Sequence, residues 1–73
     1  MKQKYDIREF VEVPTRQSVL SALVERVRAR RKERGLSQKQ LAVRSGVSYA
    51  SVRRFETEGE ISLSSLLRIA QAL

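Results

Sequence analysis

Arginine gives this chain most of its capacity for binding chemistry. The 73 residues hold fifteen Lys and Arg against eight Asp and Glu, a net charge of +7, and eleven of the fifteen are Arg. The planar guanidinium fork matches phosphate groups and guanine edges, whereas a surface that serves solubility alone would hold more Lys. Although a basic run is also typical of a solvated helix face, the charge balance predicts a polyanionic partner. The densest run comprises Arg26, Arg28, Arg30, Arg31, Lys32 and Arg34.

The residue types that are missing exclude most catalytic chemistry. The chain has no His and no Cys, so it lacks an imidazole base, a thiol nucleophile and the usual ligands of zinc. Its glycines, Gly35, Gly46 and Gly59, lie too far apart to form a phosphate-binding loop. We therefore expect a protein that is not an enzyme and that uses no metal and no cofactor.

The length and the hydropathy pattern predict one small domain in the cytoplasm. Seventy-three residues leave no room for a second core. The apolar runs are too short to span a membrane, and the polar N-terminal residues lack the apolar core of a signal peptide. We expect no membrane partner.

Apolar residues at helical spacing predict two helices in the first part of the domain. The first helix is expected to begin at Thr15 or Ser18 and to end at Gly35. A capping-box pattern that starts at Ser37 predicts a second, shorter helix over 38–45. Their expected buried residues are Val19, Leu20, Leu23, Val24, Val27, Leu41 and Ala42.

Two further helices are expected after a break at residues 45–48. Gly46 suits a left-handed backbone there, and Val47 is a lone apolar residue in the turn. A third helix over 49–57 should follow, and Ser62 should cap a fourth. Their apolar residues are Val52, Phe55, Leu63, Leu66, Leu67, Ile69, Ala70 and Leu73.

Residues 1–16 form a predicted extended arm ahead of a domain over 17–73. Pro14 stops regular structure, and a short strand over 9–13 is one interpretation. A frayed tail is the other. The arm carries much apolar surface for a terminus, which favours packing on the body or on a partner. These residues are Tyr5, Ile7, Phe10, Val11 and Val13.

Two short helices joined by a turn that contains Gly, between longer amphipathic helices, form the helix-turn-helix plan. The match is carried by Gly35-Leu36-Ser37-Gln38, Leu41-Ala42, Ser45-Gly46-Val47-Ser48, Val52, Glu56 and residues 66–73. With these residues the chain closely resembles the phage repressor and Cro family of helix-turn-helix domains, which also includes small bacterial regulators and antitoxins. The resemblance covers residues 20–73 and implies an all-α, compact four-helix lambda-repressor-like fold. Many members have a fifth helix that builds the dimer, and we expect none in this chain.

The third helix is the predicted reading element for double-stranded DNA. With Val52 buried, Arg54 falls on the side of the first turn, where an Arg can bond guanine O6 and N7, and Arg53 suits a phosphate. The resemblance implies base-edge contacts from Tyr49, Ala50, Ser51 and Arg54. It also implies that Gln38 bonds a phosphate and braces the next helix. The predicted DNA-binding residues are Gln38, Ser48, Tyr49, Ala50, Ser51, Arg53 and Arg54.

Glu56 has a different expected role on the same helix. DNA phosphates repel a carboxylate, so its side chain should turn inward and be paired. In the family the matching acid forms a salt bridge to an Arg near the end of the first helix, the place that Arg31 occupies here. We therefore expect Arg31 and Glu56 to form a structural ion pair.

These features predict sequence-specific DNA binding by a homodimeric transcriptional regulator, a repressor. The alternative is an antitoxin subunit that neutralises a toxin and regulates its own operon through the same domain. A third interpretation is RNA or membrane-surface binding by the basic stretch 26–34. We expect the dimer to depend on the last helix, and the arm to reinforce it or to bind a partner protein. The expected contact residues are Phe10, Val11, Val13, Leu63, Leu67 and Leu73.

Overall fold

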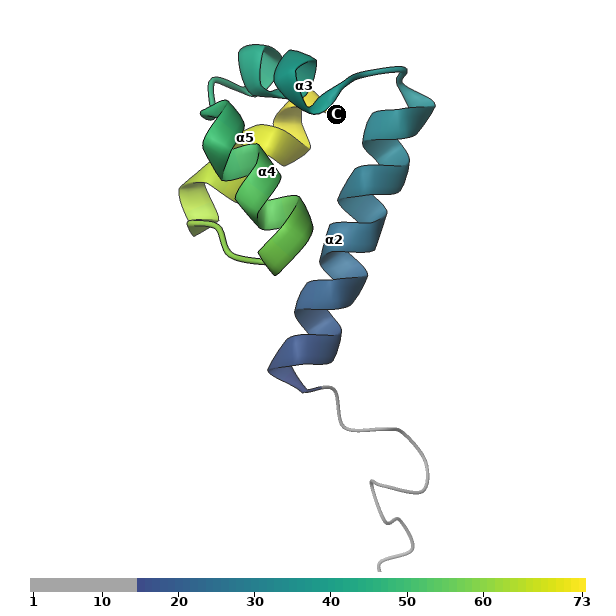
Figure 1. Ribbon diagram of the computed structural model, residues 1–73, viewed down its shortest axis with the longest axis vertical. Helices are drawn as coiled ribbons and strands as arrows, with labels where there is room; N and C mark the ends of the chain where they lie inside the picture. Colours follow the sequence, from purple (N-terminus) through teal and green to yellow (C-terminus); the bar gives the residue numbers. More distant parts are fainter. Residues whose placement is uncertain (1–14) are drawn as a thin grey trace, which may run out of the picture.

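Residues 15–73 are described by the computed structural model and form four α-helices, with no strand in this part of the chain. In chain order they are α2 (Arg16–Glu33), α3 (Gln38–Ser45), α4 (Tyr49–Glu58) and α5 (Leu63–Ala72) (Figure 1). The predicted all-α, four-helix fold is confirmed. The expected strand over 9–13 and the apolar arm residues lie outside the described residues.

A hydroxyl group caps the N-terminus of each of the four helices within residues 15–73. The side chains of Thr15, Ser37, Ser48 and Ser62 each accept a hydrogen bond from the backbone N–H three residues further on. Such a cap typically contributes about 1 kcal/mol, because it satisfies an N–H that has no partner within the helix. Since Thr15 rather than Ser18 is the cap, α2 begins one residue before the expected domain boundary at 17.

Glycines in the left-handed backbone region end α3 and α4. Gly46 and Gly59 both have φ 74° and ψ 17°. Few other residues adopt this conformation without strain, so these glycines let the chain turn sharply away from each helix. At the end of α2 the cap is Arg34, and Gly35 follows with φ 70°.

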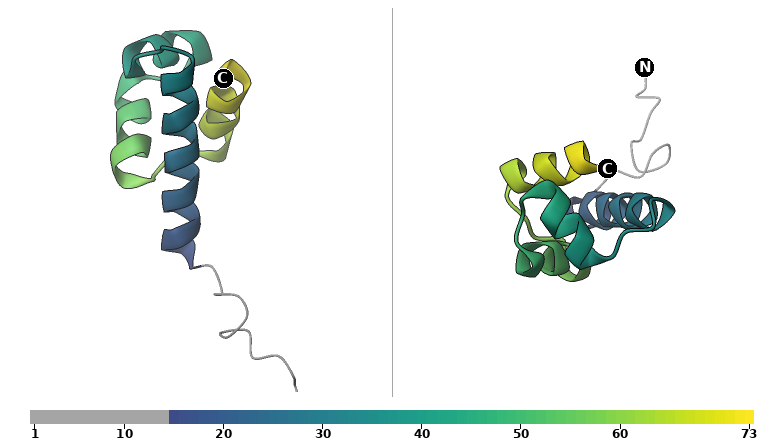
Figure 2. Two further views of the ribbon diagram at one scale, coloured as in Figure 1. Left: turned by 90° about the vertical axis from the view of Figure 1, so that its right-hand side faces the viewer. Right: turned by 90° about the horizontal axis from the view of Figure 1, so that it is seen from above.

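The hydrophobic core lies where α3 packs against α4 and α5, and α2 closes it by contacting α4 (Figure 2). Phe55, Leu41, Ile69 and Val52 are fully buried, so the expected inward faces of α3 and α4 are confirmed, whereas on α5 only Ile69 of the expected apolar residues is buried. Val47 is also buried and belongs to this core. It therefore pins the turn between α3 and α4 and is more than the lone turn residue that the sequence suggested. The core comprises Val24, Val27, Leu41, Ala42, Val47, Val52, Phe55 and Ile69.

Some residues that the helical spacing placed on apolar faces are exposed. On α2, Val24 and Val27 are buried while Val19 is 51% exposed, because the first turns of α2 extend beyond the other helices (Figure 1). On α5, Ile69 is buried while Leu63 and Leu67 are 73% and 55% exposed. The domain thus leaves apolar surface uncovered on α2 and α5, and on α3 Val43 is 84% exposed.

Candidate nucleic-acid interface

A buried ion pair joins α2 to α4. Arg31 donates from Nε to Glu56 Oε2 and from Nη2 to Glu56 Oε1, both at 2.9 Å. The Glu56 side chain is 2% exposed and that of Arg31 10%. This two-pronged geometry satisfies both oxygens, which a buried carboxylate needs if it is to remain charged. The structure therefore places Arg31 and Glu56 together, as the sequence predicted.

The same carboxylate also holds α3. Gln38 donates from Nε2 to Glu56 Oε1 at 3.0 Å, and Arg31 donates from Nη1 to the carbonyl of Leu36 at 2.8 Å. Arg28 adds a more distant charge, with its Nε 3.7 Å from Glu56 Oε1. Glu56 is thus the point at which α2, α3 and α4 are tied together.

The pKa of Glu56 lies below its usual value of 4.5 despite burial. Burial raises the pKa of this carboxyl because it disfavours the charged form. Hydrogen bonds from Arg31 and Gln38, with the charges of Arg31 and Arg28, lower the pKa by more. Glu56 is therefore ionised at neutral pH.

The first turn of α4 stands open to solvent. Ser48, Tyr49 and Ala50 are exposed, and Ser51 is half-buried. Ser48 accepts a hydrogen bond from the Ser51 N–H at 3.1 Å and donates its own hydroxyl to Ser51 Oγ at 2.9 Å. Four of the predicted DNA-binding residues therefore form one accessible turn, with the two serines holding each other in place.

Two cations flank the ring of Tyr49. Lys39 Nζ lies 5.4 Å from the ring centroid and Arg53 Cζ lies 5.8 Å from it. Both distances are within the range at which a cation is attracted to an aromatic face. Lys39 was not among the residues expected at the site. Its position next to Gln38, in the first turn of α3, was the one feature of the sequence that could have indicated its place at the site.

Arg53 and Arg54 are adjacent in sequence but differ in their partners. Arg54 forms ion pairs with Glu60 at 2.9 Å and with Glu58 at 3.3 Å, whereas within residues 15–73 no carboxylate lies within 4.0 Å of Arg53. Sequence reasoning missed Glu58 and Glu60. The spacing of Arg54 and Glu58 at i and i+4 was a usable signal for one of them.

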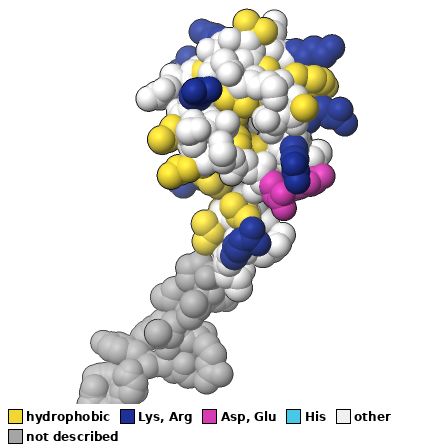
Figure 3. All heavy atoms as spheres, turned by 90° about the vertical axis from the view of Figure 1, so that its left-hand side faces the viewer, with side chains coloured by type: hydrophobic (Ala, Val, Ile, Leu, Met, Phe, Trp, Pro, Cys, Tyr) yellow, Lys and Arg dark blue, Asp and Glu magenta, His cyan; other side chains and the backbone are white. Residues whose placement is uncertain are grey.

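The surface around these residues mixes charge and apolar groups. On the face shown in Figure 3, basic side chains stand at several places around the edge, and acidic side chains gather at one place beside a basic one. Within the described residues there is no cluster of side chains that could hold a metal ion, and no helix is both long and apolar enough to cross a membrane.

A capped, exposed helix braced by a shorter helix across a glycine turn defines a helix-turn-helix domain of the DNA-binding class. A family model described as Helix-turn-helix matches residues 27–73, well over half of the chain. The chain belongs to this family and to its lambda-repressor-like type, and the protein is a DNA-binding transcription regulator. Comparison with curated proteins and with solved structures gave no significant match.

Replacement of Arg31 should cost far more stability than replacement of Arg28. Arg31→Ala leaves the buried Glu56 charge without its main partner, at a cost of about 3–5 kcal/mol, which approaches the whole stability of a domain this small. Arg28→Ala removes only a distant, 41% exposed partner, so about 1 kcal/mol or less is expected. Urea unfolding followed by circular dichroism measures both. Equal losses of stability in the two variants would contradict the role of the Arg31–Glu56 pair in holding α2, α3 and α4 together.

Stability should also fall in acid because of Glu56. Its pKa is lower in the folded than in the unfolded chain, so its contribution is complete above about pH 4.5 and is lost as the pH falls through the folded value. The Glu56→Gln variant should be less stable than the wild type at neutral pH. Its free energy of unfolding should also fall less than that of the wild type on acidification. Urea unfolding across this pH range, with Glu33→Gln as a matched loss of one exposed carboxylate, tests the assignment. A Glu56→Gln variant that keeps the wild-type pH dependence would refute it.

Proposed function

We propose that this protein binds duplex DNA sequence-specifically as a dimer and represses transcription. The observation that carries the proposal is the exposed first turn of α4, fixed to α2 and α3 through Glu56. A rigidly held helix end of this kind fits the major groove, where each base pair presents a distinct pattern of donors and acceptors. Repression is favoured because occupancy of DNA is sufficient for it, whereas activation needs a further contact surface.

Within this proposal the side chains divide into two roles. Ser48, Tyr49, Ala50 and Ser51, together with Arg54, contact base edges. Gln38, Lys39 and Arg53 contact phosphates. Gln38 can do so while it braces Glu56, because its amide nitrogen carries two hydrogens and the contact to Glu56 uses one.

The dimer is proposed to form through α5. Leu63 and Leu67 are spaced four residues apart, so they share one face of the helix, and both are exposed. Leu73, at the end of this helix, is half-buried. Two modules on successive half-sites would make the contacts that one module is too small to supply.

An antitoxin role is the second candidate. The first turns of α2 project beyond the body and expose Val19, which leaves surface for a second protein. The apolar arm residues Phe10, Val11 and Val13 precede this point in the sequence. A toxin bound there would leave α4 free for DNA, so both activities could reside in one chain. Recovery of a stable partner from the native cell would favour this candidate.

Salt dependence and two arginine variants test the DNA proposal. Affinity for duplex DNA should fall with salt at a logarithmic slope of about −0.9 per phosphate neutralised. Arg53→Ala should weaken binding to all sequences alike and reduce the slope by about 1. Arg54→Ala should instead relax the preference at one base pair by about 1–3 kcal/mol. Fluorescence anisotropy with a duplex enriched by selection, and with its single-base variants, measures all three.

Competition between ligands provides the control for this measurement. Anionic vesicles should displace the duplex only weakly, because the basic stretch 26–34 has too few large apolar residues to insert into lipid. RNA should also compete weakly, because the deep, narrow major groove of an A-form helix does not admit protein side chains. A slope near zero, or equal competition by RNA, would count against the DNA proposal. If both variants lose the same affinity for all sequences, the proposed orientation of α4 in the DNA groove is wrong.

The oligomeric state should depend on the exposed leucines of α5. Leu63→Ser with Leu67→Ser should yield a folded monomer, because neither side chain belongs to the core. Deletion of residues 1–13 should leave a dimer, weakened only if the arm reinforces it. Sedimentation equilibrium distinguishes the two variants, and circular dichroism confirms folding. If the deletion gives a monomer while the leucine variant stays dimeric, the interface lies on the arm.

A further inference from the structure

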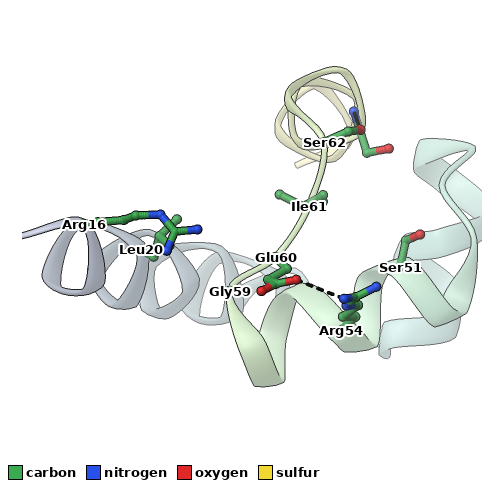
Figure 4. A pocket seen from close by; sticks show the side chains of 9 residues that line it. Arg16, Leu20, Ser51, Arg54, Gly59, Glu60, Ile61 and Ser62 are labelled. Atoms are coloured by element: carbon green, nitrogen blue, oxygen red, sulfur yellow. Dashed lines mark hydrogen bonds and ion pairs between the residues drawn. The ribbon is translucent and has the colours of Figure 1, made fainter.

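Arg54 is held in place by two carboxylates that approach it from different parts of the chain. Its Nε donates to Oε1 of Glu58, in the last turn of α4, at 3.3 Å. Its Nη2 donates to Oε1 of Glu60, in the following loop, at 2.9 Å, as Figure 4 shows. A guanidinium group has five N–H donors, of which these bonds use two. Both hydrogens of Nη1 and the second hydrogen of Nη2 remain, and the side chain is 61% exposed even while it is paired.

The remaining donors suit a guanine. Recognition of guanine needs two parallel N–H donors directed at O6 and N7, and the unused end of the Arg54 fork supplies them without breaking either ion pair. Arg54 also lines the same cavity as Ser51, one turn earlier on α4, among the proposed base contacts (Figure 4). The two carboxylates thus hold Arg54 beside the reading turn.

The position of Glu60 is set by the packing of the loop. It follows Gly59, which is buried and has φ 74°. A Cβ on Gly59 would lie 3.5 Å from Leu20 Cβ and 4.0 Å from Val24 Cγ2, so the loop rests directly against α2. Glu60 therefore reaches Arg54 from a backbone that is anchored on another helix.

We propose that Glu58 and Glu60 are positioning residues that determine specificity by holding Arg54 for a guanine contact. The inference rests on the proposed base-reading role of Arg54. An unrestrained Arg side chain loses rotamer freedom when it binds a base. When the base at that position is not guanine, such a side chain can turn to a nearby phosphate instead. Because Arg54 is already ordered, it loses less conformational entropy when it contacts guanine. To contact a phosphate instead, it would have to break two ion pairs. Arg53, which has no such partner within residues 15–73, provides affinity without selectivity.

Glu60→Ala should lower base selectivity without a general loss of binding. The ratio of affinities for the selected duplex and for its variants at the Arg54-dependent base pair should fall about 2- to 10-fold, the range expected from losing one pre-ordered side chain. Affinity for random-sequence duplex should not fall, because a negative charge near the phosphates is removed. Glu33→Ala removes the same charge at the end of α2 and should leave the ratio unchanged.

A double-mutant cycle separates this mechanism from a general effect of charge. In an Arg54→Ala background, Glu60→Ala should leave the ratio unchanged, because the side chain that Glu60 positions is absent. The inference is overturned if Glu60→Ala keeps the wild-type ratio, or if it lowers the ratio equally without Arg54. If Arg54→Ala alone changes no base preference, the base-reading role fails first, and the inference falls with it. Circular dichroism melts verify that each variant is folded.

Discussion

The buried carboxylate of Glu56 is the constraint on which the arrangement of the other helices depends. An unpaired charge in this position would be too costly to bury, so Arg31 and Gln38 must both reach it. Arg31 comes from α2 and Gln38 from the first turn of α3, while Glu56 itself lies on α4. Satisfying one carboxylate thus fixes the relative positions of three helices, which the small hydrophobic core alone would hold less specifically.

This constraint explains how so small a domain can hold α4 rigidly while its first turn is exposed. The inner face of α4 is fixed by Val52 and Phe55 in the core and by Glu56 in the ion pair. Its opposite side takes no part in the core and carries Tyr49 and Arg53. The division between inward and outward residues follows from helical periodicity, so the core residues of α4 and its proposed DNA contacts are different side chains.

The sequence predicts local features of this fold better than contacts between distant residues. Each helix start is encoded by a hydroxyl residue next to the helix, and the turns by Gly46 and Gly59, so the helix bounds follow from neighbouring residues. The Arg31–Glu56 pair spans 25 residues and was accessible only through the resemblance to a known family. The contact of Lys39 with Tyr49, the ion pair of Glu60 with Arg54 and the burial of Val47 depend on how helices and loops pack. The hydrophobic periodicity of the sequence does not predict that packing.

The charges of the exposed surface are organised by whether they have a partner. Lys39 and Arg53 flank Tyr49, which orders them weakly and leaves their charge available to phosphates. Arg54 is instead fixed by two carboxylates, at the cost of bringing negative charge close to a polyanion. In the proposed mechanism that cost is spread over all sequences, whereas the benefit of an ordered fork appears only at a matching base pair. Acidic residues on a DNA-binding face can therefore favour selectivity even though they oppose affinity.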